Sequence, residues 1–391
     1  MSAHPSRYPS PVSEAQPPRL IATPDQLAGL VRDLKRETVV AVDTEAASFH
    51  RHQNRIYLIQ VSSRSETSIV DPLAVEDLSA LGRVLSDPAV ETVFHDADYD
   101  LRLLHLQYGI SVQGLFDTRV AAEFLNEPGL GLAALLEKYL EVKIDKRFQR
   151  ADWSLRPLSD EMMAYAATDT RHLVELRDLM ATRLEQAGRM AWAEEEFRIL
   201  EQVRWTENGD REPAWLRIKS AKSLQPRQLA ILRELQTWRQ AVAEKMDRAE
   251  FRIVGNEALL EIARQAPESE EALAAIKGVG KETLRRRGRQ ILAAVRRGLR
   301  VPAKDLPRLE RKPRPRREPE IEGRISRLKQ ARGRLATRLA LPPGVVCPNS
   351  ILEAIARANP DSREALAAVP GVRQWQVEAG GDELLAAVRT P

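Results

Sequence analysis

Residues 39–45, Val-Val-Ala-Val-Asp-Thr-Glu, constrain the fold more than any other segment of the chain. The four apolar residues predict a buried strand, and the two acids stand at its end. Because side chains two apart on a strand project from the same face, Asp43 and Glu45 are expected to lie side by side. Like charges this close raise each other's pKa unless a cation lies between them. Hard divalent ions prefer carboxylate ligands, so this strand end predicts half of a metal site.

Further candidate acids occur where a second strand is followed by a helix. Residues 92–101 are typical of a short apolar strand, a turn and the first turn of a helix. Asp96, Asp98 and Asp100 are all candidates there, since the helix dipole favours acids in a first turn. The spacing alone does not choose among the three.

A later helix is predicted to begin after Ser159, which is expected to be its N-cap. Tyr165 and Asp169 are four residues apart and therefore share one face of this helix. The same face contains an apolar stripe of Met162, Ala166, Leu173 and Leu176. A carboxylate within such a stripe requires a cation or hydrogen bonds.

The order Asp43-x-Glu45, Asp100, Tyr165-x-x-x-Asp169 resembles the exonuclease motifs of the DEDD superfamily in its tyrosine-bearing branch. The histidine-bearing branch places its base five residues before the last Asp, where this chain has Ala164. The flanking segments resemble the ribonuclease D family over roughly residues 20–200, and this resemblance selects Asp100 over the two neighbouring acids. The matching flanks are residues 57–60, 94–101, 116–118, 152–153 and 156–158.

The resemblance implies hydrolysis of a phosphodiester with two divalent metal ions, Mg²⁺ or Mn²⁺, starting at a 3′ end. Two ions about 4 Å apart can activate the attacking water and stabilise the departing oxygen. By resemblance, Asp43 bridges both ions, Glu45 and Asp169 complete the site of the nucleophile's ion, and Asp100 supports the second ion. Tyr165 is expected to orient the water, because a phenol with a pKa of about 10 is a poor base at neutral pH.

Four other polar or aromatic residues allow two interpretations each. Asp117 is expected to cap the helix that begins near position 118, with a direct part in the active site as the alternative. Trp153 is expected either to anchor a packed loop or to line the substrate groove. For Gln60 a satisfied strand-end amide is favoured over a nucleotide contact, and for His95 a structural role is favoured over a phosphate contact.

An internal repeat defines the C-terminal half of the chain. Residues 256–267 recur as 349–360, and residues 271–279 recur as 364–372. Each copy has Leu, Ile and Ala at helical spacing with Pro or Gly between helices, which predicts a small all-helical domain. The copies resemble HRDC domains, the helical modules shared by helicases of the RecQ type and ribonuclease D.

The two copies differ in charge. In the first, Gly278-Val-Gly280 leads into residues 281–300, which contain eight Lys or Arg and one acid. Such a turn and clustered cations favour binding of nucleic acid, with a solvated helix face as the alternative. The second copy has two Arg against three acids over its corresponding stretch, so a weaker or structural role is expected. The nucleic-acid-binding candidates are Lys281, Arg285, Arg286, Arg287 and Arg289.

At 391 residues the chain exceeds one hydrophobic core of ordinary size. We predict an α/β ribonuclease-H-like exonuclease domain, a mixed sheet flanked by helices, followed by two small all-α HRDC domains. The expected divisions are a disordered tail at 1–18, the exonuclease domain at 19–205, the first HRDC domain at 215–298, a basic Pro-rich linker at 299–321 and the second HRDC domain at 322–390.

Composition favours a cytoplasmic protein. No apolar run approaches the roughly 20 residues that span a bilayer, and the first 18 residues lack the apolar core of a secretory signal. The single cysteine, Cys347, excludes an internal disulfide. It takes the place of Val254 in the repeat and is therefore expected to be a small buried residue.

The function predicted by the residues and the resemblance together is a metal-dependent 3′–5′ exoribonuclease that releases nucleoside 5′-monophosphates. RNA with a 3′ end is the expected partner, with tRNA precursors as the leading candidate. We expect neither membrane association nor a small-molecule cofactor, and the oligomeric state is left open. A DNA exonuclease of the same superfamily is one alternative, since contacts to the 2′-OH discriminate the two polymers. A noncatalytic nucleic-acid-binding scaffold is the other, although the intact acids argue against it. A ring of modules around a single strand is a further hypothesis.

Overall fold

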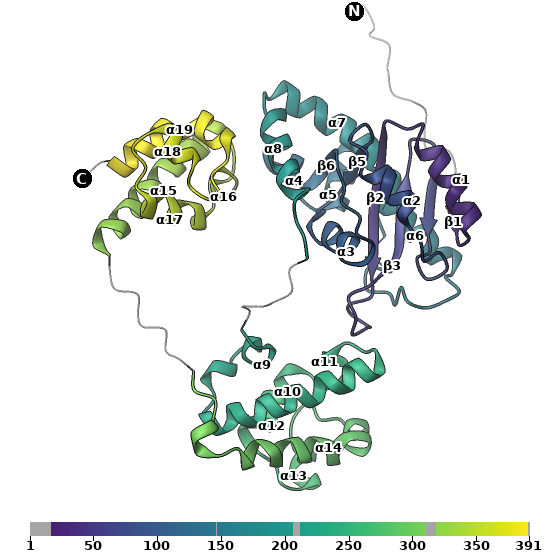
Figure 1. Cartoon of the computed structure of the whole chain (residues 1–391), viewed down its shortest axis with the longest axis vertical. Helices are drawn as coiled ribbons and strands as arrows, with labels where there is room; N and C mark the ends of the chain where they lie inside the picture. Colours follow the sequence, from purple (N-terminus) through teal and green to yellow (C-terminus); the bar gives the residue numbers. More distant parts are fainter. Residues whose placement is uncertain (1–16, 146, 206–211, 310–317, 390–391) are drawn as a thin grey trace, which may run out of the picture.

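Three bodies follow one another along the chain in this computed structural model, which describes residues 17–145, 147–205, 212–309 and 318–389 (Figure 1). The first body has a sheet and helices, and the other two are helical. We call them the α/β domain, the first helical module (α9 to α14) and the second helical module (α15 to α19). The predicted tail up to residue 16 and residues 310–317 of the predicted linker lie outside the described residues.

The α/β domain is built on a six-stranded sheet with the order β1-β4-β3-β2-β5-β6. β3 runs antiparallel to both of its neighbours, and the other strands are parallel to one another. The predicted apolar strand is β2, which lies near the centre and buries Val39, Val40, Ala41 and Val42. The strands are β1 (Arg19–Ile21), β2 (Val39–Ala46), β3 (Ile56–Ser62), β4 (Thr67–Val70), β5 (Glu91–Phe94) and β6 (Leu115–Asp117).

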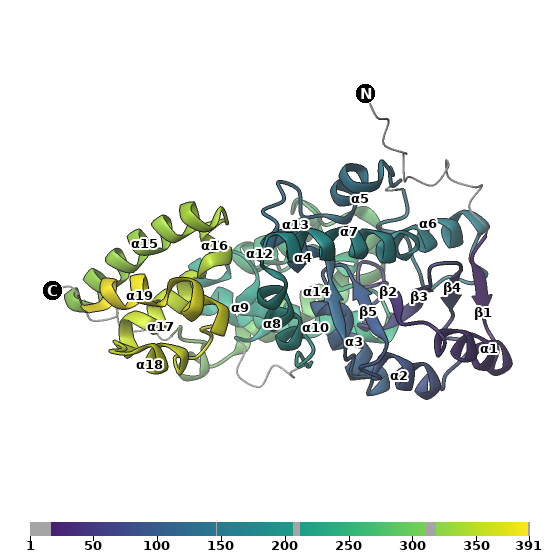
Figure 2. The ribbon, with the colours of Figure 1, turned by 90° about the horizontal axis from the view of Figure 1, so that it is seen from above.

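Helices cover both faces of the sheet. Seen from above, α6 and α7 lie on one side of the strands, and α1 and α2 lie on the other (Figure 2). This arrangement confirms the predicted mixed sheet flanked by helices. The helices are α1 (Pro24–Leu34), α2 (Ser79–Leu85), α3 (Asp98–Tyr108), α4 (Thr118–Phe124), α5 (Leu132–Leu140), α6 (Asp160–Arg171), α7 (Leu173–Gln186) and α8 (Met190–Leu200).

In the described residues, helices α10 to α14 of the first module repeat the arrangement of α15 to α19 in the second. In the first module Arg239 donates to the carbonyl of Val254 and to the side chain of Asn256, and in the second the matching Arg332 makes the same two bonds. Cys347 is buried as expected, and burial raises its pKa to about 12. The first module contains α9 (Ala214–Arg217), α10 (Pro226–Met246), α11 (Glu250–Ile253), α12 (Asn256–Gln265), α13 (Glu270–Ala274) and α14 (Lys281–Arg300). The second contains α15 (Pro319–Leu339), α16 (Pro343–Val346), α17 (Asn349–Ala358), α18 (Arg363–Ala367) and α19 (Gln374–Arg389).

The modules join the α/β domain in different ways. The first module has a hydrophobic core of its own, whereas the core of the second is continuous with that of the α/β domain. At this second junction Trp375 stacks on Trp192, with ring centroids 5.0 Å apart, and meets the ring of Phe124 edge-on. The carboxylate of Glu195 accepts hydrogen bonds from the backbone N–H groups of Gln374 and Trp375 at the start of α19.

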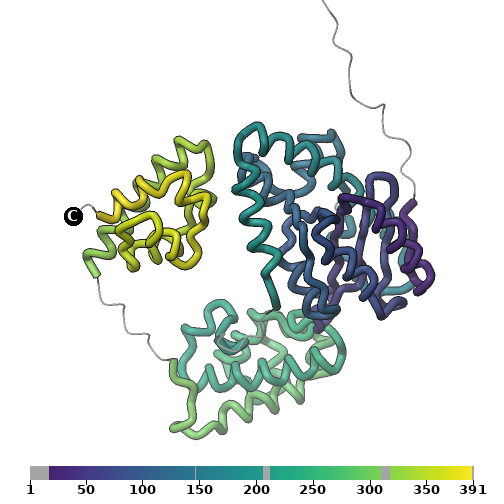
Figure 3. Tube along the Cα trace, turned by 45° about the horizontal axis from the view of Figure 1, so that its top comes forward, coloured from purple at the N-terminus to yellow at the C-terminus, as the bar shows by residue number. Residues whose placement is uncertain are grey.

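The α/β domain contacts both helical modules, and Figure 3 follows the chain through all three bodies. The α/β domain contacts the first module through the loop between β2 and β3, where the Ala249 N–H donates to the carbonyl of His50 at 3.1 Å. Its contact with the second module is made by Trp375, as described above. Among the described residues, no helix is long and apolar enough to cross a membrane.

Candidate active site

Three of the predicted acids meet at the end of β2. One carboxylate oxygen from each of Asp43, Glu45 and Asp169 lies within 4.8 Å of the others. β2 supplies the first two from one face, and α6, which packs on β2 and β3, supplies the third. All three residues are partly exposed, so an ion and a phosphate can reach them. An all-oxygen set of this size fits a hard divalent cation.

Asp100 lies beside this cluster, in the first turn of α3. The hydroxyl of Thr44, between the two β2 acids, donates a hydrogen bond to the Asp100 carboxylate. The charge of Asp100 also raises the pKa of Asp43. The other two candidates have cationic partners, since Asp98 binds Arg102 at 2.7 Å and Asp96 faces Arg119 at 3.6 Å. The geometry therefore favours the same acid that the family resemblance selects.

Asp117 holds the helix that presents this acid. It caps α4 as predicted, accepting hydrogen bonds from the N–H groups of Arg119 and Val120. Its buried carboxylate also accepts from the N–H groups of Asp96 and Ala97, just before α3 begins. One side chain thus fixes the starts of two helices, and no local sequence pattern predicts the second half of this role.

The pKa values of all four acids are raised, so in the metal-free protein the cluster tends to retain protons. Burial is the main cause that raises the pKa of Asp43 and of Glu45 well above the usual range, and the charges of neighbouring acids add to it. Burial likewise raises the pKa of Asp100 to about 7 and that of Asp169 to about 6. A bound cation favours the charged carboxylates and reverses these shifts. The cluster therefore has the electrostatics of a cation site.

Tyr165 lies one turn from Asp169 on α6. Burial and then the charges of Asp169, Glu45 and Asp43 raise the pKa of its phenol, which stays protonated at neutral pH. The ring stacks against Trp153, with centroids 6.0 Å apart, and meets Phe148 edge-on. Trp153 is 1% exposed, so it is a packed anchor and not a wall of the groove.

The side chains of His95 and Gln60 differ in whether their polar atoms have hydrogen-bond partners. The Nδ1 atom of His95 shares a hydrogen bond of 2.9 Å with the Thr118 hydroxyl, and burial lowers its pKa to about 4. This neutral, bonded imidazole has the structural role predicted for it. Gln60 is fully buried and pairs with Asp43 in the sheet register, yet neither of its amide atoms has a partner among the residues described. The predicted satisfied amide is therefore not found among the described protein groups.

The unpaired Gln60 amide is expected to lower the free energy of unfolding, which a substitution can test. A buried amide without a partner costs about 1–3 kcal/mol. Gln60→Met keeps the length of the side chain and removes the polar atoms, so it is expected to raise the free energy of unfolding of the metal-free protein by about 1 kcal/mol. Urea unfolding of both proteins in EDTA measures this difference. A loss of stability would show that the amide is hydrogen-bonded in solution.

The predicted nucleic-acid-binding residues all lie on α14 of the first module. Arg285 and Arg286 form ion pairs with Glu282 within the helix. Arg287 contacts the sulfur of Met246 at 2.9 Å, and Arg289, 96% exposed, lies 4.0 Å from the carboxylate of Glu270. These residues remain candidates for binding a polyanion, separate from the acidic cluster.

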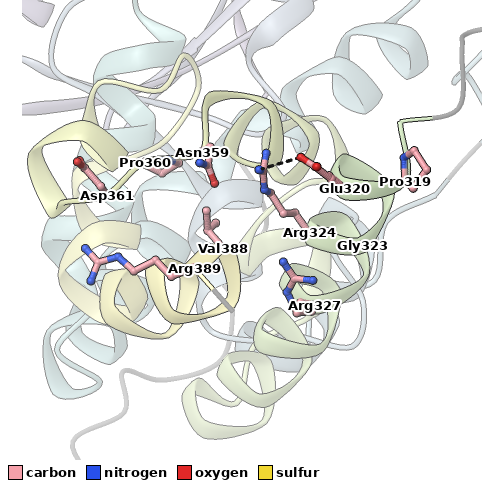
Figure 4. A pocket seen from close by; sticks show the side chains of 10 residues that line it. All are labelled: Pro319, Glu320, Gly323, Arg324, Arg327, Asn359, Pro360, Asp361, Val388 and Arg389. Atoms are coloured by element: carbon pink, nitrogen blue, oxygen red, sulfur yellow. Dashed lines mark ion pairs between the residues drawn. The ribbon is translucent and has the colours of Figure 1, made fainter. Parts of the chain in front are cut away.

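A pocket of about 750 Å³ lies in the second module (Figure 4). It is formed by the start of α15, the segment after α17 and the end of α19. Two of its arginines are engaged with backbone carbonyls, since Arg324 donates to Ala356 and Arg327 donates to Ala387. None of the clustered acids lines it, so it is distinct from the candidate active site.

Comparisons with known proteins agree with this architecture. Residues 18–185 match the family model described as a 3′-5′ exonuclease, and residues 228–295 and 322–388 match the HRDC domain. Ribonuclease D of Granulibacter bethesdensis is 32% identical over 385 residues, which cover 97% of this chain and 93% of that protein. Ribonuclease D of Escherichia coli is 32% identical over 290 residues, which cover 74% of this chain and 77% of that protein.

Two solved structures show the same likeness. The crystal structure of E. coli RNase D, described as an exoribonuclease involved in structured RNA processing, superposes with a TM-score of 0.67 at 25% identity, covering 95% of this chain and 98% of that one. The catalytic core of RRP6 from Trypanosoma brucei superposes with a TM-score of 0.65 at 29% identity, covering 72% of this chain and 80% of that one.

The mixed sheet with its acidic cluster, joined to two helical modules, defines a 3′–5′ exonuclease whose clustered acids could hold a divalent cation. Its relatives act on RNA according to their names. The chain belongs to the ribonuclease D family and is a 3′–5′ exoribonuclease.

Proposed function

We propose that the protein trims the 3′ ends of structured RNA, with tRNA precursors as the first candidates, and releases nucleoside 5′-monophosphates. Asp43, Glu45, Asp100 and Asp169 hold two divalent ions in this proposal, with Mg²⁺ as the ion used and Mn²⁺ as a substitute. The observation that carries it is the convergence of three carboxylates within 4.8 Å beside Asp100. The proposal also includes a cytoplasmic location for the protein.

The proposed roles follow from where each side chain lies. When bound, the two ions lower the pKa of the attacking water and stabilise the departing 3′ oxygen. Asp43 would bind both ions, Glu45 and Asp169 would complete the ligands of one ion, and Asp100 would support the other. Thr44 holds the Asp100 carboxylate through its hydroxyl. Tyr165 places its phenol beside the attacking water and orients it.

The proposed domain boundaries are those predicted from the sequence, 19–205, 215–298 and 322–390. The helical modules extend slightly beyond them, because α14 continues to Arg300 and α15 begins at Pro319. In the proposed arrangement the basic face of α14 holds the RNA while the α/β domain cuts it. Such tethering raises the local concentration of substrate at the cluster.

The test is degradation of 5′-labelled single-stranded RNA and of DNA with the same sequence, in Mg²⁺, in Mn²⁺ and in EDTA. The expected result is a ladder that shortens from the 3′ end of RNA, absent in EDTA and in Asp100→Ala. A tRNA precursor with a 3′ extension should be shortened to the mature end faster than an unstructured RNA of equal length. Preference for DNA would move the protein to the alternative function, and a precursor left intact would reject the tRNA assignment.

Tyr165→Phe separates orientation of the water from its deprotonation. Loss of one orienting hydrogen bond is expected to lower kcat about 10- to 100-fold, with KM nearly unchanged. Because the phenol is protonated at neutral pH, the shape of the pH–rate profile between pH 6 and 9 should be the same for both proteins. A profile that loses an ionisation in the variant would identify Tyr165 as a base. Trp153→Phe is the matched control, since it disturbs the packing beside Tyr165 and leaves the phenol in place.

A further inference from the structure

The loop that follows the β2 acids crosses to the first helical module. Besides the His50 carbonyl, several more groups of this loop bind the module, including the backbone N–H of Gln53, which donates to Asp247 at 3.4 Å. The N–H of His52 donates to Asp247 at 3.1 Å, and the Nε of Arg252 donates to the carbonyl of Phe49 at 2.8 Å. Phe49 follows Glu45 by four residues, so the module is fixed to the chain a short distance beyond the acidic cluster.

Two phenylalanines meet at this junction without being buried. The rings of Phe49 and Phe251 have centroids 5.0 Å apart at an angle of 54°. Their exposed fractions are 42% and 45%, which is high for large apolar side chains in contact with each other. The guanidinium groups of Arg252 and Arg150 lie over the ring of Phe49, at 5.0 Å and 5.7 Å from its centroid. Exposed aromatic surface therefore lies next to cations, with one ring from each body.

A hollow lies beside the aromatic pair. Its volume is about 310 Å³, near the lower end of the range for ligand sites. Phe251 lines it together with Arg51 and His52 of the β2–β3 loop. The junction thus leaves space next to one of the exposed rings. A contact that only joined two domains would be expected to close over the ring.

Direct contacts link the junction to the acidic cluster. The carbonyl of Arg150 bonds the Nε2 of His50 at 2.9 Å, which ties the loop carrying Phe49 to the segment carrying Phe148. The ring of Phe148 in turn meets that of Tyr165 at 5.7 Å. The path from the exposed rings to the candidate active site therefore runs through adjacent residues.

Contacts also link the junction to the basic helix α14. Arg287 of α14 touches Met246 at the end of α10, one residue before Asp247, which binds the loop. Arg248 lies close enough to Arg287 for its charge to lower the pKa of that guanidinium. A series of residue contacts therefore connects the acids with the proposed RNA-binding helix.

We propose that Phe49 and Phe251 form a stacking site for unpaired bases of the RNA strand whose 3′ end occupies the acidic cluster. Arg150 and Arg252 bind the phosphates that flank these bases. Aromatic faces accept any base, and guanidinium groups attract the backbone, so this site holds single-stranded RNA without reading its sequence. The first module then forms part of the substrate path itself. This inference rests on the proposed function of the acidic cluster.

Photo-crosslinking tests the contact independently of cleavage. Asp43→Asn protein is mixed with a single-stranded RNA that carries one 5-iodouridine at successive positions from its 3′ end, irradiated, and digested for mass spectrometry. The expected result is a crosslink to Phe49 or Phe251 from one or two adjacent positions several nucleotides from the end. Crosslinks spread over many residues, or absent from both rings at every position, would overturn the proposal.

Kinetics of Phe251 variants test its role in the reaction. Phe251→Leu keeps an apolar contact with Phe49 and removes the stacking face, so KM for a 20-nucleotide RNA is expected to rise about 10-fold with kcat unchanged. Hydrolysis of a dinucleotide, too short to reach the rings, should be unaffected, and Phe251→Tyr should restore the parent KM. Leu179→Ala, on the exposed surface of α7, is the matched control.

The outcomes separate this proposal from the function on which it rests. If the parent protein crosslinks through Phe49 or Phe251 but degrades no RNA, the stacking site stands and the proposed function fails. If the parent degrades RNA and Phe251→Leu leaves KM unchanged, the pair is a domain contact only. An equal loss on long RNA and on the dinucleotide would also overturn the proposal, because it would show a structural defect.

Discussion

Asp43→Asn is expected to lower kcat roughly 10³- to 10⁴-fold, since it removes the acid that bridges the two proposed ions and with it several kcal/mol of transition-state stabilisation. Binding of RNA by the basic helix should be retained, because α14 lies in another module. The measurement is single-turnover degradation of labelled RNA together with its affinity by filter binding.

A matched pair of acids on α3 controls for the loss of a charge. Asp100→Asn is expected to reduce the rate in a similar way, whereas Asp98→Asn should stay within about twofold of the parent, since surface substitutions rarely matter. Asp98 is two residues away on the same helix and binds Arg102 instead of facing the cluster. Equal effects of the two substitutions would place the reaction elsewhere.

The metal-free protein is expected to lose stability as the pH rises from about 4 to about 7. The folded-state pKa is about 6 for Asp169 and about 7 for Asp100, above the value of 3.8 usual for this side chain. In this window the folded protein retains protons that the unfolded chain has released, so the free energy of unfolding falls with pH. Asp169 alone accounts for at most about 3 kcal/mol, at 1.36 kcal/mol for each pKa unit.

Saturating Mg²⁺ is expected to remove this pH dependence, because the bound acids are then ionised in the folded protein as well. Urea unfolding between about pH 4.5 and pH 7.5, with EDTA or with Mg²⁺, gives the two curves. They should diverge as the pH rises, and the EDTA curve of Asp43→Asn should lie above that of the parent near pH 7, since one buried repulsion is gone. Parallel curves would mean that these acids do not bind the ion.

Local patterns predicted the parts of the site that depend on one element. The period of two in a strand was enough to place Asp43 and Glu45 on one face, and helical spacing was enough to pair Tyr165 with Asp169. Both arrangements are present in the structure. The choice of Asp100 required the family resemblance, because first-turn acids are favoured in any helix.

The parts that depend on several elements could not be predicted. Thr44 reaches Asp100 across 56 residues of sequence, and the second pair of bonds to Asp117 joins loops about 20 residues apart. Gln60 has the composition of an ordinary strand end, and only the packed sheet leaves it without a partner. The meeting of Phe49 with Phe251 depends on how two separate bodies dock, which no pattern within either body records.

The shared core of the second module has a consequence for biosynthesis. Trp375 enters the core some 180 residues after Glu195, which caps its helix from the α/β domain. At ribosomal rates of about 5–20 residues per second, this delay is roughly 10–35 s. During that time the faces of Trp192 and Phe124 have no cover from Trp375. The nascent nuclease is therefore most exposed to aggregation and to chaperones just before its last helix emerges, and its first domain reaches its final packing only then.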